Sequence, residues 1–299
     1  MNIVMLGHPN AGKTTYMSAM YKVMSTEGIA GFRVRARSDA HHYQLMSNAD
    51  RIGRGLYPAP SDQHAEYPLT FRHGSSALFE FLWRDYRGGA LLDRSTTQDT
   101  QRLLADLRTA DAIVLFMDLL DLQRSHIARQ KIRGLTTVLF RALTGRDRLT
   151  PLVIVLTKAD LVNPNVQDTG LEAFDSFIQA VDGNPAVIGT WIEVACGPYP
   201  QNVIAPVLFC LYFGLESQAY YLSALVEQSN AVGDSFAAGD TWRNRVKSRF
   251  TGQVANRDLA SMAYMKAYQE YQALQTVLGP AQLLGDMLGD LEVFGGGLG

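Results

Sequence analysis

The sequence predicts an α/β protein in which helices cover both faces of a mostly parallel β-sheet, giving three layers, with a helical extension at the C-terminal end. Short apolar runs alternate along the chain with segments of helical periodicity, as in folds with parallel strands. A glycine-rich loop joins the first apolar run to the first helical segment. After Gln228 the apolar strand-like runs cease and helical periodicity continues alone.

The first of these segments contains a phosphate-binding loop. Ile3 to Leu6 is suited to a buried strand, and the next eight residues, G-H-P-N-A-G-K-T, fit the pattern G-x-x-x-x-G-K-[ST]. Lys13 is expected to reach the β- and γ-phosphates of a nucleotide, and the Thr14 hydroxyl to bind Mg²⁺. Because backbone N–H groups and a helix N-terminus bind phosphate, we expect cofactor contacts from Asn10, Ala11, Gly12, Lys13, Thr14 and Thr15. The fold class is therefore that of a P-loop NTPase.

Composition excludes several classes of protein. The 299 residues are 47% hydrophobic and carry a net charge of −2, so no global charge favours nucleic acid or an anionic membrane. Cys196 and Cys210 are too few for a disulfide framework or a zinc site, which favours reduced cytoplasmic thiols. The longest apolar run, Val203 to Leu215, is too short to span a bilayer. Since the first strand begins at once, no signal peptide is expected, and a cytoplasmic protein without stable membrane insertion is predicted.

The segment after the first helix is polar. Phe32 to Arg54 is rich in arginine and histidine, and we expect a helix from about Ser38. His41 and His42 are neighbours without acidic or cysteine partners nearby, so solvent-facing histidines are favoured over a metal site.

A hairpin follows, and it leads into a second candidate motif. Tyr67 to Phe71 and Ala77 to Trp83 are strand-like, and the turn between them predicts one antiparallel edge strand. Asp85 directly follows the second strand, and Gly88 comes three residues later. Such an Asp can hold Mg²⁺ through water, and the glycine N–H can meet the γ-phosphate. Ser61, in the proline-rich loop before the hairpin, is the best candidate for a further Mg²⁺ ligand.

The remaining elements continue the alternation of strands and helices. Because ligands bind over the carboxyl ends of parallel strands, the residues that end these strands are the ones to examine. We expect helices over Thr96–Arg108, Leu122–Leu143, Leu171–Val181 and Val203–Gln228, and strands over Ala112–Met117, Pro151–Leu156 and Val187–Val194.

The C-terminal part has a different character, which predicts two domains, 1–228 and 229–299. Leu259 to Leu278 is an amphipathic helix with Tyr264, Tyr268, Tyr271, Leu274 and Leu278 on one face. This stripe is expected to pack on its own domain rather than on a partner, although the sequence leaves both open. Gly279-Pro280 is expected to end the helix. The basic run 243–249 is expected to be solvated, and Gly295 to Gly299 to form a flexible end.

Four motifs together resemble a known superfamily. The phosphate loop, D-x-x-G at Asp85 to Gly88, T-K-A-D at Thr157 to Asp160 and a small turn at Ala195 to Gly197 occur in the order seen in translation-factor-class and Ras-like GTPases. The W-R-D-Y-R-G-G form and the paired prolines are similar to bacterial double-GTPase proteins associated with conflict or defence systems. The resemblance covers about Met1 to Gln228.

This resemblance implies GTP/GDP and Mg²⁺ as cofactors and assigns further residues. Asp160 would accept hydrogen bonds from guanine N1–H and N2–H₂, which adenine cannot supply. The stem of Lys158 would lie over the base, and Thr157 stands where Asn is commonest. The backbone of Ala195 and Cys196 would reach guanine O6.

Two departures from the family pattern bear on catalysis: the loop threonine that closes over Mg²⁺ in the family has Ser61 as its best candidate here, and the glutamine that often follows D-x-x-G is absent. Gly89 occupies the position where a glutamine often orients the attacking water, while Arg87 lies inside the motif and could assist together with Lys13, Asp85 and Gly88. We therefore expect slow, Mg²⁺-dependent GTP hydrolysis that switches binding of a protein partner, such as an activator or a companion GTPase. The alternative is a GTP-binding scaffold without useful hydrolysis. An ATPase or small-molecule kinase is disfavoured by Lys158 and Asp160.

Overall fold

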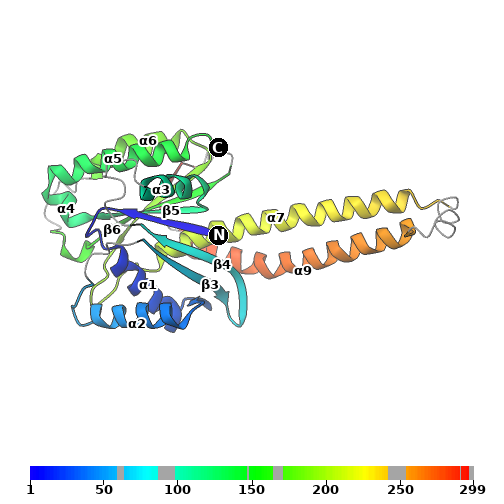
Figure 1. Ribbon diagram of the computed structural model, residues 1–299, viewed down its shortest axis with the longest axis horizontal. Coiled ribbons are helices and arrows are strands. Elements are labelled where there is room, and N and C mark those ends of the chain that lie inside the picture. The colour runs from blue at the N-terminus through cyan, green and yellow to red at the C-terminus, as the bar shows by residue number, and fades with distance from the viewer. Residues whose placement is uncertain are drawn as a thin grey trace. The chain divides into compact units, whose positions relative to one another are not determined.

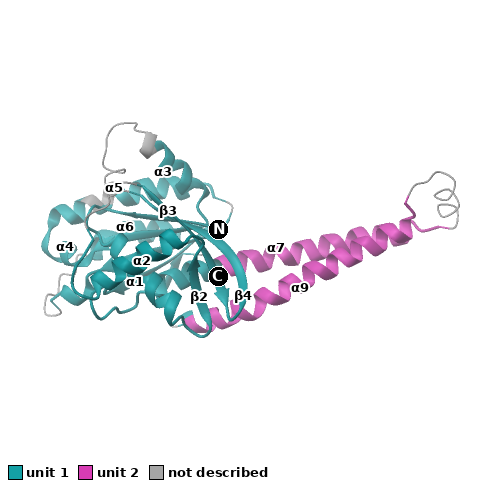
Figure 2. Cartoon of the chain, turned by 60° about the horizontal axis from the view of Figure 1, so that its bottom comes forward, with its two compact units in different colours: residues 1–213, 288–299 teal, residues 214–287 magenta. Residues whose placement is uncertain are grey.

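The computed structural model describes residues 1–58, 64–86, 98–146, 148–163, 171–241, 254–289 and 291–295. It divides into two compact units, coloured separately in Figure 2. One contains 1–213 and 288–299, and the other contains 214–287. The boundary expected at residue 228 falls inside a single long helix. No helix in the described ranges has both the length and the apolar content needed to cross a bilayer.

The first unit is built on an eight-stranded sheet with the order β2-β3-β4-β1-β5-β6-β7-β8. Its central pairs, from β4 through β1, β5 and β6 to β7, are all parallel, and the outer pairs β2·β3, β3·β4 and β7·β8 are antiparallel. The three-layer α/β prediction is confirmed. The strands are β1 Asn2–Gly7, β2 Phe32–Ala36, β3 Ala65–His73, β4 Ser76–Asp85, β5 Ala112–Asp118, β6 Thr150–Thr157, β7 Val187–Val194 and β8 Val293–Gly295.

Helices cover both faces of this sheet (Figure 1). The central strands β1, β5 and β6 are buried on both sides, and their residues are almost entirely apolar. Alternate residues such as Val4, Ile113 and Ile154 pack with α3, α5 and α6 in one core, while α1 and α2 lie on the other side. The helices of this unit are α1 Lys13–Thr26, α2 Asp39–Ile52, α3 Gln98–Thr109, α4 Leu119–Arg124, α5 His126–Leu143 and α6 Asp175–Asp182, with short 3₁₀ turns at Ala159–Leu161 and Leu171–Phe174.

Two sequence-based expectations for this unit were only partly right. The hairpin strand β3 is antiparallel to β4 as expected, but it does not lie at the edge, because β2 pairs with its other side. The helix expected over Leu122–Leu143 is two helices. Ser125 ends α4 and begins α5, since its hydroxyl accepts a hydrogen bond from the Ala128 N–H at 3.2 Å.

The second unit consists of most of α7 (Ala205–Ala238) and α9 (Asn256–Leu288), which lie side by side and antiparallel in both views (Figures 1 and 2). The Ser229 hydroxyl donates to a Glu270 carboxylate oxygen at 2.7 Å, and Tyr264 donates likewise to Asp234 at 2.6 Å. These bonds fix the register of the two helices.

Two expectations for the C-terminal part were wrong, and a third, on the tyrosine stripe, was only partly right. Pro280 lies inside α9 rather than ending it, because the residue before it is glycine and offers no Cβ to clash with the proline ring. The tyrosine stripe packs on its own unit only in part, because Tyr264 lies against Gly233 whereas Tyr268 is 63% exposed. The buried face of the helix carries small residues such as Ala260 and Ala267. Gly295 belongs to β8 rather than to a flexible end; 296–299 and the basic run 243–249 lie outside the described residues.

Candidate functional site

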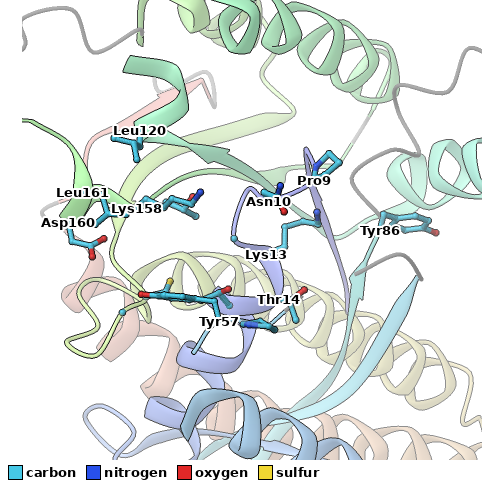
Figure 3. Close-up of a pocket in the computed structure, with 16 residues that line it drawn as sticks. Pro9, Asn10, Lys13, Thr14, Tyr57, Tyr86, Leu120, Lys158, Asp160 and Leu161 are labelled. Carbon is cyan, nitrogen blue, oxygen red and sulfur yellow. The ribbon is translucent and has the colours of Figure 1, made fainter. Parts of the chain in front are cut away.

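A cavity of about 440 Å³ lies at the carboxyl ends of the parallel strands (Figure 3). From the phosphate loop it is lined by Asn10, Gly12, Lys13, Thr14 and Thr15. From the far end it is lined by Thr157, Lys158, Asp160 and Cys196. Residues separated by up to 186 positions in the sequence thus converge on one space, which is where the parallel sheet predicts a ligand.

The loop conformation depends on its glycines. Gly12 has φ 80° and ψ 11°, a left-handed conformation that begins α1, and Asn10 has φ 66°. Gly7 approaches β5 so closely that a Cβ there would lie 2.6 Å from the Phe116 carbonyl oxygen. The loop can therefore bring its backbone N–H groups and the N-terminus of α1 to one side of the cavity.

Lys13 and Asp85 form the charged centre of the site. Both side chains are buried; the Lys13 ammonium donates to the Gly7 carbonyl at 3.2 Å, and the Thr14 hydroxyl is 3.5 Å from Asp85 Oδ2. Burial raises the pKa of Asp85 to about 6, although nearby Lys13 opposes the rise. Burial also lowers the pKa of Lys13, while Asp85 opposes that change.

The other oxygen of Asp85 fits a metal ligand. Oδ1 is buried and has no hydrogen-bond partner among the described residues. No group of three or more His, Cys, Asp or Glu side chains in those residues could hold a metal ion. Mg²⁺ does not need such a group, because it is usually bound by one or two protein ligands together with waters and substrate phosphates. Thr14 and Asp85 match that requirement.

A network of polar side chains, which the sequence analysis did not identify, fixes the end of β4 around Asp85. The His64 ring lies 3.2 Å from the Asp85 carbonyl oxygen and 3.1 Å from a Glu66 carboxylate oxygen. Arg84 is 2.6 Å from Asp106, which also accepts the Tyr86 hydroxyl hydrogen bond. The His64 hydrogen bond lowers the pKa of Glu66, and so do the charges of Arg84 and Arg102. Both neighbours of Asp85 are therefore held in place.

At the other end of the cavity, T-K-A-D connects three elements. The Thr157 hydroxyl lies 3.0 Å from the Ala11 carbonyl oxygen and 3.1 Å from that of Met117, so it ties β6 to the phosphate loop and to β5. Lys158 has φ 60° and forms an ion pair with Asp118. This pairing neutralises its charge while the side chain lines the cavity.

Asp160 lies beside Cys196 and Tyr57. A Cβ added at Gly197 would be 3.6 Å from Asp160 Oδ2 and 3.4 Å from the Tyr57 hydroxyl oxygen. Burial raises the pKa of the Cys196 thiol to about 12, and the neighbouring Asp160 carboxylate adds to this. The thiol is thus neutral and unreactive, so it contributes packing rather than nucleophilic chemistry.

Of the residues expected from the sequence, Asn10, Gly12, Lys13, Thr14, Thr15, Thr157, Lys158, Asp160 and Cys196 line the cavity. Ala11 and Ala195 are buried and do not line the cavity, although the Ala11 carbonyl is bonded to Thr157. Ser61, Arg87 and Gly88 lie outside the described residues. Sequence reasoning missed Tyr57, whose ring lies between Thr14 and Asp160 in Figure 3. It also missed Tyr86, Leu120 and Leu161, which all follow strand ends and could have been found there.

Comparison with known proteins gives the following results. The family model described as Double-GTPase 2 matches residues 2–184. No curated protein matches the chain.

Several solved structures of GTP-binding proteins are similar to the chain. Nucleolar GTP-binding protein 1 of Plasmodium falciparum is 16% identical with a TM-score of 0.43, over 78% of this chain and 95% of that one. The Arl6 BBS3 small GTPase of Trypanosoma brucei, with bound GppNp, is 15% identical with a TM-score of 0.39, over 71% and 95%. A Sulfolobus solfataricus GTP-binding protein in complex with GDP is 12% identical with a TM-score of 0.36, over 65% and 46%.

Proposed function

This chain belongs to the double-GTPase 2 family and is a P-loop GTP-binding protein, and we propose that it hydrolyses GTP slowly to GDP with Mg²⁺. The single observation that supports this best is the cavity itself. It places Lys13 and Thr14, next to buried Asp85, at one end and Asp160 at the other. A nucleoside triphosphate needs both ends, because one binds phosphates and the other binds the base.

The phosphates would bind at the N-terminus of α1. Lys13 supplies a buried positive charge for the β- and γ-phosphates, and the loop N–H groups supply neutral donors. Thr14 and Asp85 would hold Mg²⁺, which bridges phosphate oxygens and neutralises charge as the bond to the γ-phosphate breaks. The unbonded Oδ1 of Asp85 is the protein atom best suited to this role.

The base would bind at the far end. An ionised Asp160 accepts two hydrogen bonds from guanine N1–H and N2–H₂, whereas adenine presents an acceptor at N1. The ion pair of Lys158 with Asp118 leaves the Lys158 stem against the base. Specificity for guanine follows from these two residues.

Hydrolysis without a partner would be slow. Gly89 provides no side chain to orient water, so the attacking water depends on Arg87, on the backbone near Gly88, or on a group from another protein. In the sequence, Ser61 and Gly88 come soon after Pro58 and Tyr86, which both line the cavity. Loss of the γ-phosphate would change the surface near Pro58 and Tyr86, and with it the affinity for a protein partner.

The partner would be an activator or a companion GTPase, and the setting a bacterial conflict or defence system in the cytoplasm. A second candidate function is a GTP-binding scaffold that does not hydrolyse. Gly89 favours it, since the water-orienting side chain is missing. The complete set of Lys13, Thr14 and Asp85 opposes it.

The test compares the wild type with Lys13→Ala and Asp160→Asn, and uses Lys22→Ala as a control. Lys22 is on the same helix as Lys13 but forms an exposed ion pair with Asp50 at 2.8 Å. Lys13→Ala should abolish GTP turnover, and Lys22→Ala should leave it unchanged. Asp160→Asn should lower the affinity for GTP at least tenfold and raise the affinity for xanthosine triphosphate, whose base carries an oxygen in place of the guanine amino group.

The outcomes separate the readings. Slow turnover that Lys13→Ala removes supports a switch. Tight GTP binding without turnover supports the scaffold. Preference for ATP, or no change of base preference in Asp160→Asn, overturns the assignment of the base site.

A further inference from the structure

A second cavity, of about 410 Å³, opens at the edge of the sheet, away from the nucleotide site. It lies between the edge strand β2, the C-terminal half of α1 and the start of α2. The side chains and backbone that matter for its chemistry come from Tyr21, Arg33, Val34, Arg35, Asp39 and Arg72. All of these belong to the first unit.

Three arginines give this edge cavity its charge. Arg33 on β2 lies directly opposite Arg72 on β3 in the antiparallel register, and Arg35 follows on the same face of β2. Like charges in opposite positions destabilise a sheet. No carboxylate in the described part of the chain pairs with Arg33 or Arg35, whereas Arg37, next on that face, is 2.7 Å from Glu80. The strand thus retains two uncompensated guanidinium groups beside the cavity.

Two of these side chains, Arg33 and Arg35, lie near α1. A Cβ added at Gly28, just after α1, would lie 2.8 Å from Arg33 Cγ. The charge of Arg35 acts on the Tyr21 hydroxyl, where it opposes the rise in pKa that burial causes. That hydroxyl is fixed, because it accepts from the Ala36 N–H at 3.1 Å and lies 2.8 Å from His42 Nδ1. His42 is therefore a partly buried structural residue, contrary to the sequence-based expectation.

The backbone of β2 adds a neutral donor. The N–H of Phe32 bonds to Ile29, and that of Ala36 to Tyr21, so these groups point away from β3. By the alternation of a strand, the N–H of Val34 points the same way. Val34 itself lines the cavity, so this N–H is a candidate donor to a ligand bound there.

We propose that this edge cavity binds a phosphorylated small molecule. Guanidinium groups match phosphate oxygens in charge and in planar, bidentate geometry, and a backbone N–H can complete the contact. Three arginines against one carboxylate, that of Asp39, leave the cavity positive. Asp39 can accept a hydrogen bond from a hydroxyl of the same ligand, so a phosphorylated sugar or nucleoside fits better than inorganic phosphate alone.

The test uses the full chain saturated with GDP, so that the phosphate loop is occupied, and sodium pyrophosphate as the probe in titration calorimetry. Arg33→Gln combined with Arg35→Gln should lower the affinity for pyrophosphate at least tenfold. The matched control Arg37→Gln, on the same strand face but paired with Glu80 and outside the cavity lining, should change the affinity less than twofold.

A gain of affinity provides the second arm. Asp39→Asn removes the only carboxylate that lines the cavity among the described residues, so it should tighten pyrophosphate severalfold, a result that misfolding cannot produce. The proposal is overturned if GDP-loaded protein does not bind pyrophosphate, if Arg37→Gln weakens binding as much as the double variant, or if Asp39→Asn leaves binding unchanged. Failure of GDP to bind would be detected in a separate titration of the same protein with GDP, and would concern the nucleotide site alone.

Discussion

At the scale of single residues, the site contains two buried charged groups whose loss of hydration is unfavourable in the nucleotide-free protein. Asp85 and Lys13 are both buried, and each is held away from its ordinary pKa by loss of water rather than by its partner. A carboxylate with one unbonded oxygen and an ammonium facing a cavity are costly in the free protein. Both charges would be compensated by the Mg²⁺ and phosphates of the proposed nucleotide complex.

Substituting Asp85 by Asn should make the nucleotide-free protein more stable. The folded-state pKa is raised from 3.8 to about 6, so the folded state binds the proton more tightly than the unfolded state. This stabilisation is complete below the unfolded pKa and is lost as pH rises through about 6. At neutral pH, where wild-type Asp85 is ionised, Asp85→Asn should raise the free energy of unfolding by about 1–3 kcal/mol. Urea unfolding across this pH range measures it.

Two further results are expected for Asp85→Asn. The difference in stability between wild type and Asp85→Asn should shrink toward zero as pH falls below the unfolded pKa. The variant should also lose function, because the extra stabilisation that Mg²⁺ gives to the GTP complex should disappear. A variant that is less stable than wild type at neutral pH, or that keeps its Mg²⁺ response, would contradict this account.

The residues of the site divide by how local their signals are. Lys13, Thr14, Asp85 and Asp160 could be predicted because each belongs to a short motif beside a strand end. Tyr57 could not, since a loop tyrosine has no periodic signal and reaches the cavity only through the path of the folded chain. The pairing of Lys158 with Asp118 joins two strand ends forty residues apart.

At the scale of elements, the sequence analysis missed strand β2 and ended the last long helix too early. F-R-V-R-A, now β2, alternates apolar and polar residues as a half-buried strand does, but its arginines suggested a polar segment. Gly279-Pro280 is a common stop signal, yet the glycine permits the proline inside α9. β8 has only three residues, so no local pattern identifies it.

The packing of α7 on α9 predicts opposite effects for one substitution at two glycines. Gly233 faces Tyr264, and an added Cβ would lie 2.6 Å from its ring, so Gly233→Ala should destabilise the helical pair by about 1–3 kcal/mol. Gly134, in the middle of α5, has nothing within 4 Å of an added Cβ, so Gly134→Ala should stabilise by about 0.5–1 kcal/mol. Thermal unfolding followed by circular dichroism measures both changes. Stabilisation by Gly233→Ala would show that Tyr264 does not pack on that position.

At the scale of the whole molecule, the chain leaves the first unit and later returns to it. Residues 214–287 form the second unit, and β8 then pairs antiparallel with β7 to complete the sheet. The Thr190 hydroxyl donates to the Glu292 carbonyl at 2.6 Å, and the Gly295 N–H donates to Asp182 at 2.8 Å. Residues 292–295 therefore complete the sheet that holds the nucleotide motifs.

Phe294 is where this dependence can be measured. Its ring covers Gly189 on β7, where an added Cβ would lie 2.1 Å from the ring, and it lies 5.9 Å from the Trp191 ring centroid. Phe294→Ala should cost about 2–3 kcal/mol, less than a fully buried Phe because the ring is partly exposed. Val293→Ala, at an exposed neighbouring position, should cost under about 0.5 kcal/mol and serves as the control.

A double-mutant cycle tests the contact itself. Gly189→Ala alone should displace the Phe294 ring and destabilise the first unit, but in the Phe294→Ala background the new methyl group has room. The two changes should therefore couple by more than about 1 kcal/mol, with the double variant more stable than the sum of the single losses predicts. Additive losses in chemical denaturation would mean that β8 does not rest on β7 in solution. In that case β7 would be the edge strand of the sheet, and Phe294 would not cover Trp191.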